Sequence, residues 1–471
     1  MTRLVDSLRS SSTDRGFTLV EVIVAMVVFG LVSTGILTSA NIVIRMTADN
    51  QSREVAANLA EQQLDTDRGI LDPFQIHNIP AVVGGAPLTQ QVADRTYTIT
   101  QTTSLVSVDG ADITCGSAKS IYYRRITVQV DWTGRLPTTS PVESDTVIAP
   151  NGRINDSSTG SIAVLVSGAS GIGDAGVSVT ISPLSSTAMA LQSQPAVTDV
   201  DGCTYALGVT PGTYRVAISK ASSVDPTQTV TPTTGQPNQP SDLVVTAGAT
   251  TPVTFNYDQT ATYPLAYAPG SGATLPDSMA STFLSQGLPY SPAGSYAPLS
   301  TVSLYPYSAG YGVIAGREAS QASTLCAAED PAAWGSAPGV KAATRATALG
   351  QQPGATSPSV SVPMGVFTVT VPLTMLGSTY ITAVGTSSTA NGQPGCGTPE
   401  TFTFSKFLLP GATATFALPY GSYQLSAGAG LGLTSAPIGD PNVKIATSPY
   451  DGPLSSITSG GLLTLDPRPA S

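Results

Sequence analysis

The sequence predicts an α+β protein: a long N-terminal helix that crosses a membrane and then packs on an antiparallel sheet, followed by two all-β, sandwich-like domains. Three observations predict this class. From Phe17 to Met46 the only ionisable side chains are Glu21 and Arg45. Strong helix formers with one apolar stripe continue to about Asp67. Beyond them, short alternating strands separated by Gly, Pro and Asp turns fill most of the chain.

Composition limits the classes of function. The 471 residues are enough for about three domains at roughly 150 residues each. Charged residues make up only 11% of the chain, and its 46 Gly and 37 Pro favour strands and turns over long soluble helices. The net charge of −10 disfavours generic binding to nucleic acid or anionic lipid, so no specific nucleic-acid partner is expected. A mean hydropathy of +0.15 argues against disorder throughout.

The N-terminus combines a polar leader, residues 1–16, with an apolar run over residues 17–46. This run exceeds the roughly 20 residues that a helix needs to cross a bilayer. An ordinary secretory signal with a small-residue site at Ser39-Ala40 is one alternative, although the apolar run continues past it. A plain transmembrane anchor is another, and it leaves Glu21 unexplained, because an isolated charge in an apolar segment is costly.

Residues 16–21 read GFTLVE and resemble the prepilin processing motif of type IV pilins and of the pseudopilins of type II secretion. The resemblance implies that a prepilin peptidase cuts between Gly16 and Phe17 and that Phe17 becomes N-methylated. It also implies that Glu21 pairs with the N-terminal amine of a neighbouring subunit during assembly. Gly30 matches a glycine of the family, whereas Thr38 stands where the family often has proline.

Small residues mark one face of this apolar helix. Gly30, Thr34 and Thr38 recur at four-residue spacing, which would allow close helix packing in a membrane, or the small residues fall there by coincidence. Past the membrane, residues 47–68 carry an apolar stripe, which consists of Val55, Leu59 and Leu64. A helix from Phe17 to about Asp67 would be roughly 75 Å long at 1.5 Å per residue.

Alternating strands predict what this stripe packs against. In residues 124–132 the apolar residues occupy every second position, and residues 97–99 and 144–150 are similar. A long helix laid on such a sheet is the pilin architecture, so the resemblance extends over residues 47–150. Residues 149–160 then form a predicted linker.

The rest of the chain predicts further β domains. Residues 161–257 resemble the small Ig-like or transthyretin-like sandwiches, also known from carboxypeptidase-regulatory modules, and this implies a fold rather than a ligand. Residues 258–427 are predicted to form a second sandwich-like domain, because 413–427 echoes 204–218 as strand, Pro/Gly turn and Tyr-led strand. The tail, residues 428–471, is weakly patterned and stays unassigned.

The four cysteines contain no C-x-x-C pair, which leaves zinc and redox motifs unsupported. An exported location makes disulfides plausible. Of the three possible pairings, Cys326 with Cys396 is favoured because both lie in the second β domain. Cys115 with Cys203 would then link the pilin-like part to the first sandwich, or these two remain free thiols.

Other catalytic or metal chemistry is sparse, so we expect no enzyme activity, no cofactor and no metal. The chain has a single histidine, His77, and no G-x-S-x-G nucleophile elbow that it could serve. Residues 199–202, DVDG, hint at a calcium loop but lack its later ligands, and a tight Asp-Gly turn is the simpler interpretation.

These expectations combine into a functional prediction: a minor pilin-like subunit of a type IV pilus or related filament, with structural or adhesive β modules. The alternatives are a pseudopilin of type II secretion or DNA uptake, and a membrane-anchored surface binding protein that never assembles. Expected partners are prepilin peptidase, other pilin or pseudopilin subunits, the inner-membrane assembly platform, membrane lipid and an unidentified surface ligand. The expected location is the cytoplasmic membrane in a single pass, with extracytoplasmic C-terminal domains that reach the cell surface or pilus after assembly.

Overall fold

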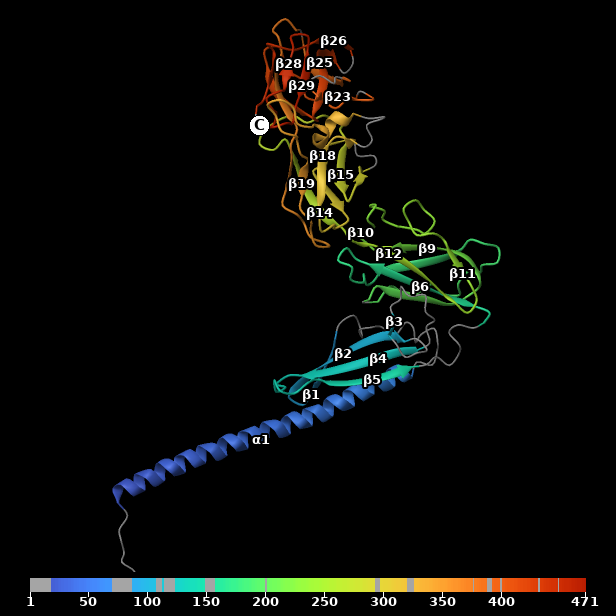
Figure 1. The fold of residues 1–471 in the computed structure, drawn as a ribbon, viewed down its shortest axis with the longest axis vertical. Helices are drawn as coiled ribbons and strands as arrows, with labels where there is room; N and C mark the ends of the chain where they lie inside the picture. The colour runs from blue at the N-terminus through green and yellow to red at the C-terminus, as the bar shows by residue number, and fades with distance from the viewer. Residues whose placement is uncertain are drawn as a thin grey trace, which may run out of the picture. The chain divides into compact units, whose positions relative to one another are not determined.

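The structure, a computed structural model, divides into two compact units, which are described separately (Figure 1). The first comprises Met1–Asp112 and Tyr122–Gly152, and the second comprises Ile113–Ile121 and Arg153–Ser471. The residues that the structure describes are 18–69, 87–106, 112–113, 123–148, 157–199, 201–292, 297–319, 326–375, 377–387, 392–398, 400–430, 433–447 and 449–471.

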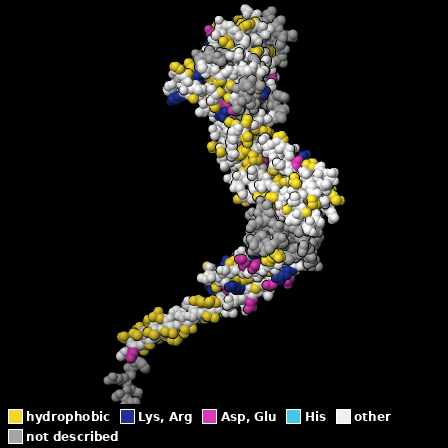
Figure 2. Space-filling model, turned by 45° about the vertical axis from the view of Figure 1, so that its right-hand side comes forward, with side chains coloured by type: hydrophobic (Ala, Val, Ile, Leu, Met, Phe, Trp, Pro, Cys, Tyr) yellow, Lys and Arg dark blue, Asp and Glu magenta, His cyan; other side chains and the backbone are white. Residues whose placement is uncertain are grey.

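Helix α1 (Leu19–Arg68) is one continuous helix of 50 residues. The large hydrophobic side chains from Leu19 to Met46 are exposed, and Figure 2 shows hydrophobic side chains gathered along this half of the helix. The helix contains a stretch long and apolar enough to cross a membrane, and none of that stretch is buried. The N-terminal half of α1 therefore has no protein core of its own within the described residues.

The C-terminal half of α1 is buried along one face. Buried positions recur every three or four residues, as one helix face requires: Asp49, Ser52, Ala56, Leu59, Ala60, Leu64 and Asp67. The predicted stripe is confirmed, with Val55 partly buried against the same core. The small side chains of Ala56 and Ala60 leave room for the sheet to approach the helix closely.

An antiparallel sheet provides the other side of this core. Its order is β1-β2-β4-β5, with β3 joined to the same sheet. The helix packs on β4 and β5, where Ile126, Val128 and Val130 are fully buried. The strands are β1 (Leu88–Val92), β2 (Arg95–Val106), β3 (Asp112–Ile113), β4 (Tyr123–Trp132) and β5 (Val142–Ile148).

A sandwich of two three-stranded sheets follows, at the position predicted for the first β domain. One sheet has the order β12-β6-β8, with β12 parallel to β6, and the other has the order β11-β9-β7. Inward-facing aliphatic residues such as Ile162, Val179 and Val216 fill the space between the sheets. The strands are β6 (Gly160–Ser167), β7 (Ser178–Pro183), β8 (Cys203–Val209), β9 (Gly212–Ser219), β11 (Leu243–Val245) and β12 (Thr250–Asn256).

The remaining β region is larger than the sequence predicts. A short pair, β10 (Ser223–Val224) with β13 (Asp258–Gln259), precedes four sheets that share one hydrophobic core. The first two sheets have the orders β17-β14-β20 and β16-β15-β18-β19. Their strands are β14 (Ala261–Tyr267), β15 (Ser281–Ser285), β16 (Leu288–Tyr290), β17 (Thr301–Leu304), β18 (Tyr311–Ala315), β19 (Ala346–Ala348) and β20 (Val360–Val362).

The other two sheets have the orders β24-β21-β27 and β23-β22-β25-β29-β28, with β26 paired to β25. The 3-10 turns η3 (Ala327–Glu329) and η4 (Pro331–Ala333) lie in the connection between β18 and β19. The strands are β21 (Gly365–Thr370), β22 (Tyr380–Gly385), β23 (Thr401–Thr403), β24 (Thr413–Leu418), β25 (Gly421–Gly430), β26 (Leu433–Pro437), β27 (Val443–Ile445), β28 (Ser456–Ile457) and β29 (Leu462–Leu465).

The C-terminal residues, left unassigned by the sequence, are integral to these sheets. The predicted boundary at residue 427 falls inside β25, and β26 to β29 all lie beyond it. Arg468 is fully buried, forms an ion pair with Asp466 at 2.6 Å, and places its guanidinium 5.2 Å from the centre of the Trp334 ring. The tail escaped prediction because contacts such as that with Trp334 join residues more than a hundred positions apart and leave no local periodicity.

The sequence echo between 204–218 and 413–427 has a structural cause. In both places a turn leads into a strand whose tyrosine hydroxyl donates to the carbonyl four residues earlier: Tyr214 to Thr210 and Tyr423 to Pro419, each at 2.8 Å. Such a bond fixes the corner between two strands, as in the tyrosine corner of Ig-like sandwiches. Gly212 is needed at the first corner, because a Cβ there would lie 2.7 Å from that of Ala188.

Candidate functional site

The first turn of α1 contains one of the two bonds of a capping box. Thr18 is the N-cap, and its Oγ1 accepts a hydrogen bond from the backbone N–H of Glu21 at 3.3 Å. The Thr18 hydroxyl lies 3.4 Å from Oε2 of Glu21 and donates to it. The pair satisfies a first-turn N–H and places an acid at the positive end of the helix dipole.

Glu21 thus has a role within its own chain that the sequence analysis missed. The signal was present, since Thr-x-x-Glu before an apolar run is a capping-box pattern. The intermolecular pairing of Glu21 stays a prediction. The predicted cleavage site, Gly16 and Phe17, lies outside the described residues.

The small-residue face of α1 has its hydroxyls paired within the helix. Thr34 donates to the carbonyl of Gly30 at 3.0 Å, and Thr38 donates to the carbonyl of Thr34 at 2.6 Å. A Cβ built on Gly30 or Gly35 would meet no atom within 4 Å. This face could therefore enter an apolar environment without the cost of an unsatisfied polar group.

Asp49 anchors the helix to the sheet just after the exposed half of α1. Its side chain is buried and accepts three hydrogen bonds: from Thr139 Oγ1 at 2.7 Å, Trp132 Nε1 at 3.1 Å and the Leu136 N–H at 3.4 Å. The donors lie at the end of β4 and in the loop that leads to β5. One carboxylate therefore fixes the helix, the strand and the loop together.

The charge of Asp49 is stabilised despite burial. Burial by itself raises the pKa of this carboxyl, but the hydrogen bonds from Thr139, Trp132 and Leu136, with the nearby Arg95, hold its pKa below the usual value. Asp49 was not predicted from the sequence, because an acid in a polar helical segment usually faces water. Its spacing from Ser52 and Ala56 places it on the buried face instead.

We predict that Asp49→Ala loosens α1 from the sheet. The change leaves the buried Trp132 indole and the half-buried donors of Leu136 and Thr139 without this acceptor, which costs about 1–3 kcal/mol for each one that water cannot reach. Hydrogen–deuterium exchange of the β4 amides should accelerate at least tenfold. Asp65→Ala is the matched control, since Asp65 is 71% exposed in its ion pair with Arg68 and exposed pairs contribute little. Equal exchange in the two variants would contradict the anchoring role.

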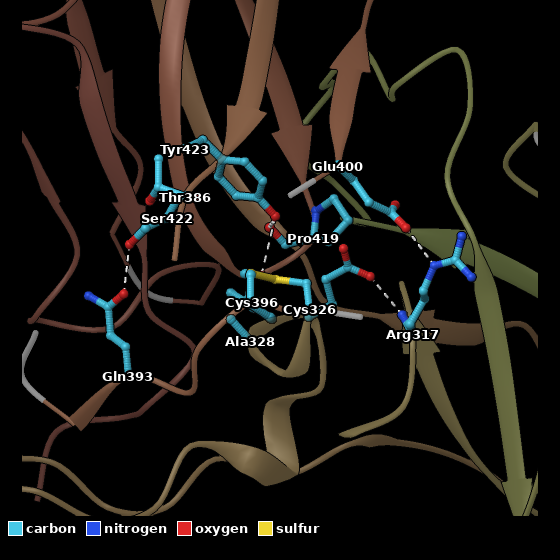
Figure 3. The surroundings of a disulfide bond; sticks show 12 residues. Arg317, Cys326, Ala328, Thr386, Gln393, Cys396, Glu400, Pro419, Ser422 and Tyr423 are labelled. Carbon is cyan, nitrogen blue, oxygen red and sulfur yellow. Dashed lines mark hydrogen bonds and ion pairs between the residues drawn. A yellow bond between two sulfur atoms is a disulfide. The ribbon is translucent and has the colours of Figure 1, made fainter. Parts of the chain in front are cut away.

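Cys326 and Cys396 form a disulfide, which is the pairing that the sequence favours (Figure 3). Cys326 directly precedes η3, and Cys396 lies between β22 and β23. The bridge therefore links the two pairs of sheets across a sequence separation of 70 residues. Cys203 is also disulfide-bonded, whereas Cys115 lies outside the described residues.

Two buried acids lie in the same β region. Glu329 accepts a hydrogen bond from the Arg317 N–H at 2.8 Å. The Arg317 side chain forms an ion pair with Glu400 (Figure 3). Burial, reinforced by the charge of Glu400, raises the pKa of Glu329 to about 8. Asp451 accepts from the Val366 N–H at 2.9 Å, and burial raises its pKa to about 8 as well.

These two acids predict that the β region is more stable in mild acid. Both folded pKa values lie above the unfolded values near 4, so the unfolded chain loses its protons first as pH rises. The free energy of unfolding should therefore fall between about pH 4 and pH 8 and then level off. We expect the full chain in detergent to melt several degrees higher at pH 5 than at pH 8 by circular dichroism.

Two matched variants test whether the buried acids cause this pH dependence of the melting temperature. Glu329→Gln should flatten the curve, because the amide stays neutral at every pH, whereas Asp201→Asn changes an exposed acid in the first sandwich and should leave it unaltered. A melting temperature that rises from pH 5 to pH 8 would exclude neutral buried acids.

The remaining predicted positions carry no metal site within the described residues. Asp199 accepts hydrogen bonds from the N–H groups of Asp201 and Cys203, and Gly202 has a φ of 74°, so this segment is a tight turn. In the part of the chain that the structure describes, no three His, Cys, Asp or Glu side chains lie close enough together to hold a metal ion. His77 lies outside that part.

Comparison with known proteins identifies the N-terminal element. Residues 11–37 match the prokaryotic N-terminal methylation motif. This match contains the predicted cleavage site, Glu21 and Gly30. No curated protein matches the chain.

Several solved structures match the chain at low identity. The Bacillus anthracis TIE protein matches at 11% identity over 73% of this chain and 67% of its own, with a TM-score of 0.19. The Streptococcal ancillary pilin matches at 10% identity over 58% of this chain and 80% of its own, with a TM-score of 0.19. BcpA, the major pilin subunit of Bacillus cereus, matches at 11% identity over 65% and 91%, with a TM-score of 0.18. TM-scores below 0.5 do not establish a common arrangement.

The match over residues 11–37 places a prepilin-type methylation motif at the start of α1, which is consistent with a type IV pilin-like protein with β domains. A methylation motif implies processing by a prepilin peptidase and assembly with other pilins. The apolar helix is consistent with a membrane anchor.

Proposed function

We propose that the chain is a minor pilin-like subunit of a type IV pilus or related filament, which displays its β domains for a structural or adhesive role. The single observation that carries this proposal is the division of α1. One half is apolar and exposed, and carries the methylation motif, while the other half is packed on its own sheet. Such a helix suits a subunit that is held in lipid first and in a bundle of like helices after assembly.

The proposed orientation places the β domains outside the cytoplasm. Arg3, Arg9 and Arg15 precede the apolar run, and positive residues beside a membrane helix favour the cytoplasmic side. The Cys326–Cys396 disulfide supports an oxidising compartment for the opposite end. The location follows as a single-pass cytoplasmic membrane protein before assembly and a surface protein afterwards.

A minor rather than a major role follows from size. More than two thirds of the chain lies beyond residue 150, and a crowded helical lattice would have to accommodate that bulk at every subunit. A sparse or tip position avoids this crowding. We therefore propose that the β domains serve display and not catalysis.

Two other functions fit the same helix. A pseudopilin of a type II secretion or DNA-uptake system would use the same processing and assembly chemistry. A lone anchored binding protein would keep α1 in the membrane and never enter a filament. Incorporation into filaments distinguishes the minor pilin from the lone anchored binding protein, because only the pilin should be found in them.

We predict cleavage between Gly16 and Phe17 followed by addition of one methyl group. Intact-mass measurement of membrane-extracted protein should show residues 17–471 plus the mass of a methyl. Gly16→Leu should remain at full length, because the resemblance implies that the peptidase requires the glycine. A mature terminus after Ala40 would instead indicate an ordinary signal peptide.

We predict that the charge of Glu21, rather than its capping bond, drives assembly. Glu21→Ala and Glu21→Gln should both be processed and stay in the membrane but be lost from sheared filaments. If Glu21 pairs with the terminal amine of a neighbour, removing the carboxylate leaves that amine buried alone, a loss of roughly 3–5 kcal/mol. Thr18→Ala removes the cap and keeps the charge, so it should assemble nearly as well as the wild type.

The three variants separate the two roles of Glu21. Loss of Thr18→Ala from filaments together with retention of Glu21→Gln would assign Glu21 to capping alone. Absence of the wild type from all filaments would favour the lone anchor.

A further inference from the structure

A small cavity lies in the second unit where the long loop after β10 meets β16 and the β17–β18 loop. Its volume is about 190 Å³, and its walls include Pro226, Gln228, Asn238, Pro289, Tyr290 and Tyr311. None of its lining residues is charged. This volume is smaller than the roughly 300–1,000 Å³ of pockets that hold drug-sized ligands, so the cavity suits one small ring.

The inner wall of the cavity is fixed by hydrogen bonds. The Gln228 amide accepts from the Tyr305 N–H at 2.8 Å and donates to the Tyr311 hydroxyl at 3.1 Å. Tyr311 donates in turn to the carbonyl of Tyr305 at 2.6 Å, and Tyr307 donates to the carbonyl of Pro226 at 3.2 Å. A wall held in this way loses little entropy when a ligand binds.

Two polar groups on the rim remain available. The Asn238 amide and the Tyr290 hydroxyl form no hydrogen bond with any side chain or backbone group in the described part of the chain, although both line the cavity. Asn238 is exposed and held in the left-handed region, with a φ of 61°. Burial raises the pKa of Tyr290, so its hydroxyl stays neutral.

We propose that this cavity binds a single neutral sugar ring, such as the terminal hexopyranose of a surface glycan. A pyranose combines an apolar C–H face, which packs on tyrosine and proline rings, with hydroxyls that an amide and a phenol can bind. The uncharged walls select against acidic or basic ligands. A compact cavity suits one ring better than an extended peptide, which needs a groove.

This inference rests on the proposed display function, because a surface subunit gives such a site access to glycans. The test measures binding with the purified full chain in lipid nanodiscs, by saturation-transfer NMR with a panel of neutral methyl glycosides. Filament incorporation is scored separately, so a failed binding test and a failed assembly test remain distinct.

The variants remove one rim group at a time. Asn238→Gly deletes the amide and keeps the left-handed backbone, and Tyr290→Phe deletes only the hydroxyl. Gln286→Gly is the control for Asn238→Gly. Gln286 also has a left-handed backbone, with a φ of 48°, but it does not line the cavity. Tyr380→Phe is the control for Tyr290→Phe. It also removes one tyrosine hydroxyl, but Tyr380 packs against Phe407 and does not line the cavity.

The expected result is millimolar binding of at least one methyl glycoside. Each rim variant should weaken it about five- to tenfold, with both controls unchanged. The proposal is overturned if no glycoside in the panel binds, or if binding survives both rim changes. Preferential binding of a proline-rich peptide, tested as a competitor, would overturn it as well and assign the cavity to peptide recognition.

Discussion

The removal of the apolar half of α1 from water is the constraint on which the rest of this protein depends. Its large hydrophobic side chains from Leu19 to Met46 are exposed, and no other described segment covers them. Exposed apolar area is costly in water, so this half must lie in lipid or against other helices. The Thr18 cap satisfies the N–H of Glu21, and the hydroxyls of Thr34 and Thr38 are bonded to carbonyls of the same helix, so these groups stay paired in either environment.

A helix shared between two environments needs a firm boundary. Asp49 provides it, since it lies where the exposed half ends and holds the sheet through a charge-assisted set of hydrogen bonds. Apolar contacts of Ala56, Leu59 and Leu64 continue the attachment. The continuous helix thus carries the sheet directly, so a force on its apolar half is passed to the sheet.

The second unit must fold stably in a long chain of which only 11% of the residues are charged. It contains buried ionisable groups, namely the ion pair of Arg468 with Asp466 and the acids Glu329 and Asp451, whose pKa values are raised by burial. The Cys326–Cys396 disulfide joins its two pairs of sheets, and the Lys341 N–H, which lies before β19, donates to the carbonyl of Pro469 after β29. A well-fixed scaffold of this kind can hold a binding site in place, and the cavity beside Gln228 is lined by the loop after β10, by β16 and by the start of β18.

The sequence by itself determined the features that depend on local chemistry. The apolar run, the methylation motif, the helix to about residue 68 and the alternating strands of the first sandwich were all predicted, because periodicity and motifs are local properties. The pairing of Cys326 with Cys396 was also favoured from the domain pattern alone. The capping role of Glu21 was readable from Thr-x-x-Glu but was masked by the stronger motif around it.

Only the tertiary structure decided the features that join distant segments. Asp49 finds its donors more than eighty residues later, and Arg468 finds Trp334 more than a hundred residues earlier. The tail could not be assigned, because strands such as β29 are short and are stabilised by their neighbours β25 and β28 rather than by their own pattern. Burial of a polar side chain depends on partners that the chain brings together only when it folds, and no local pattern encodes those partners.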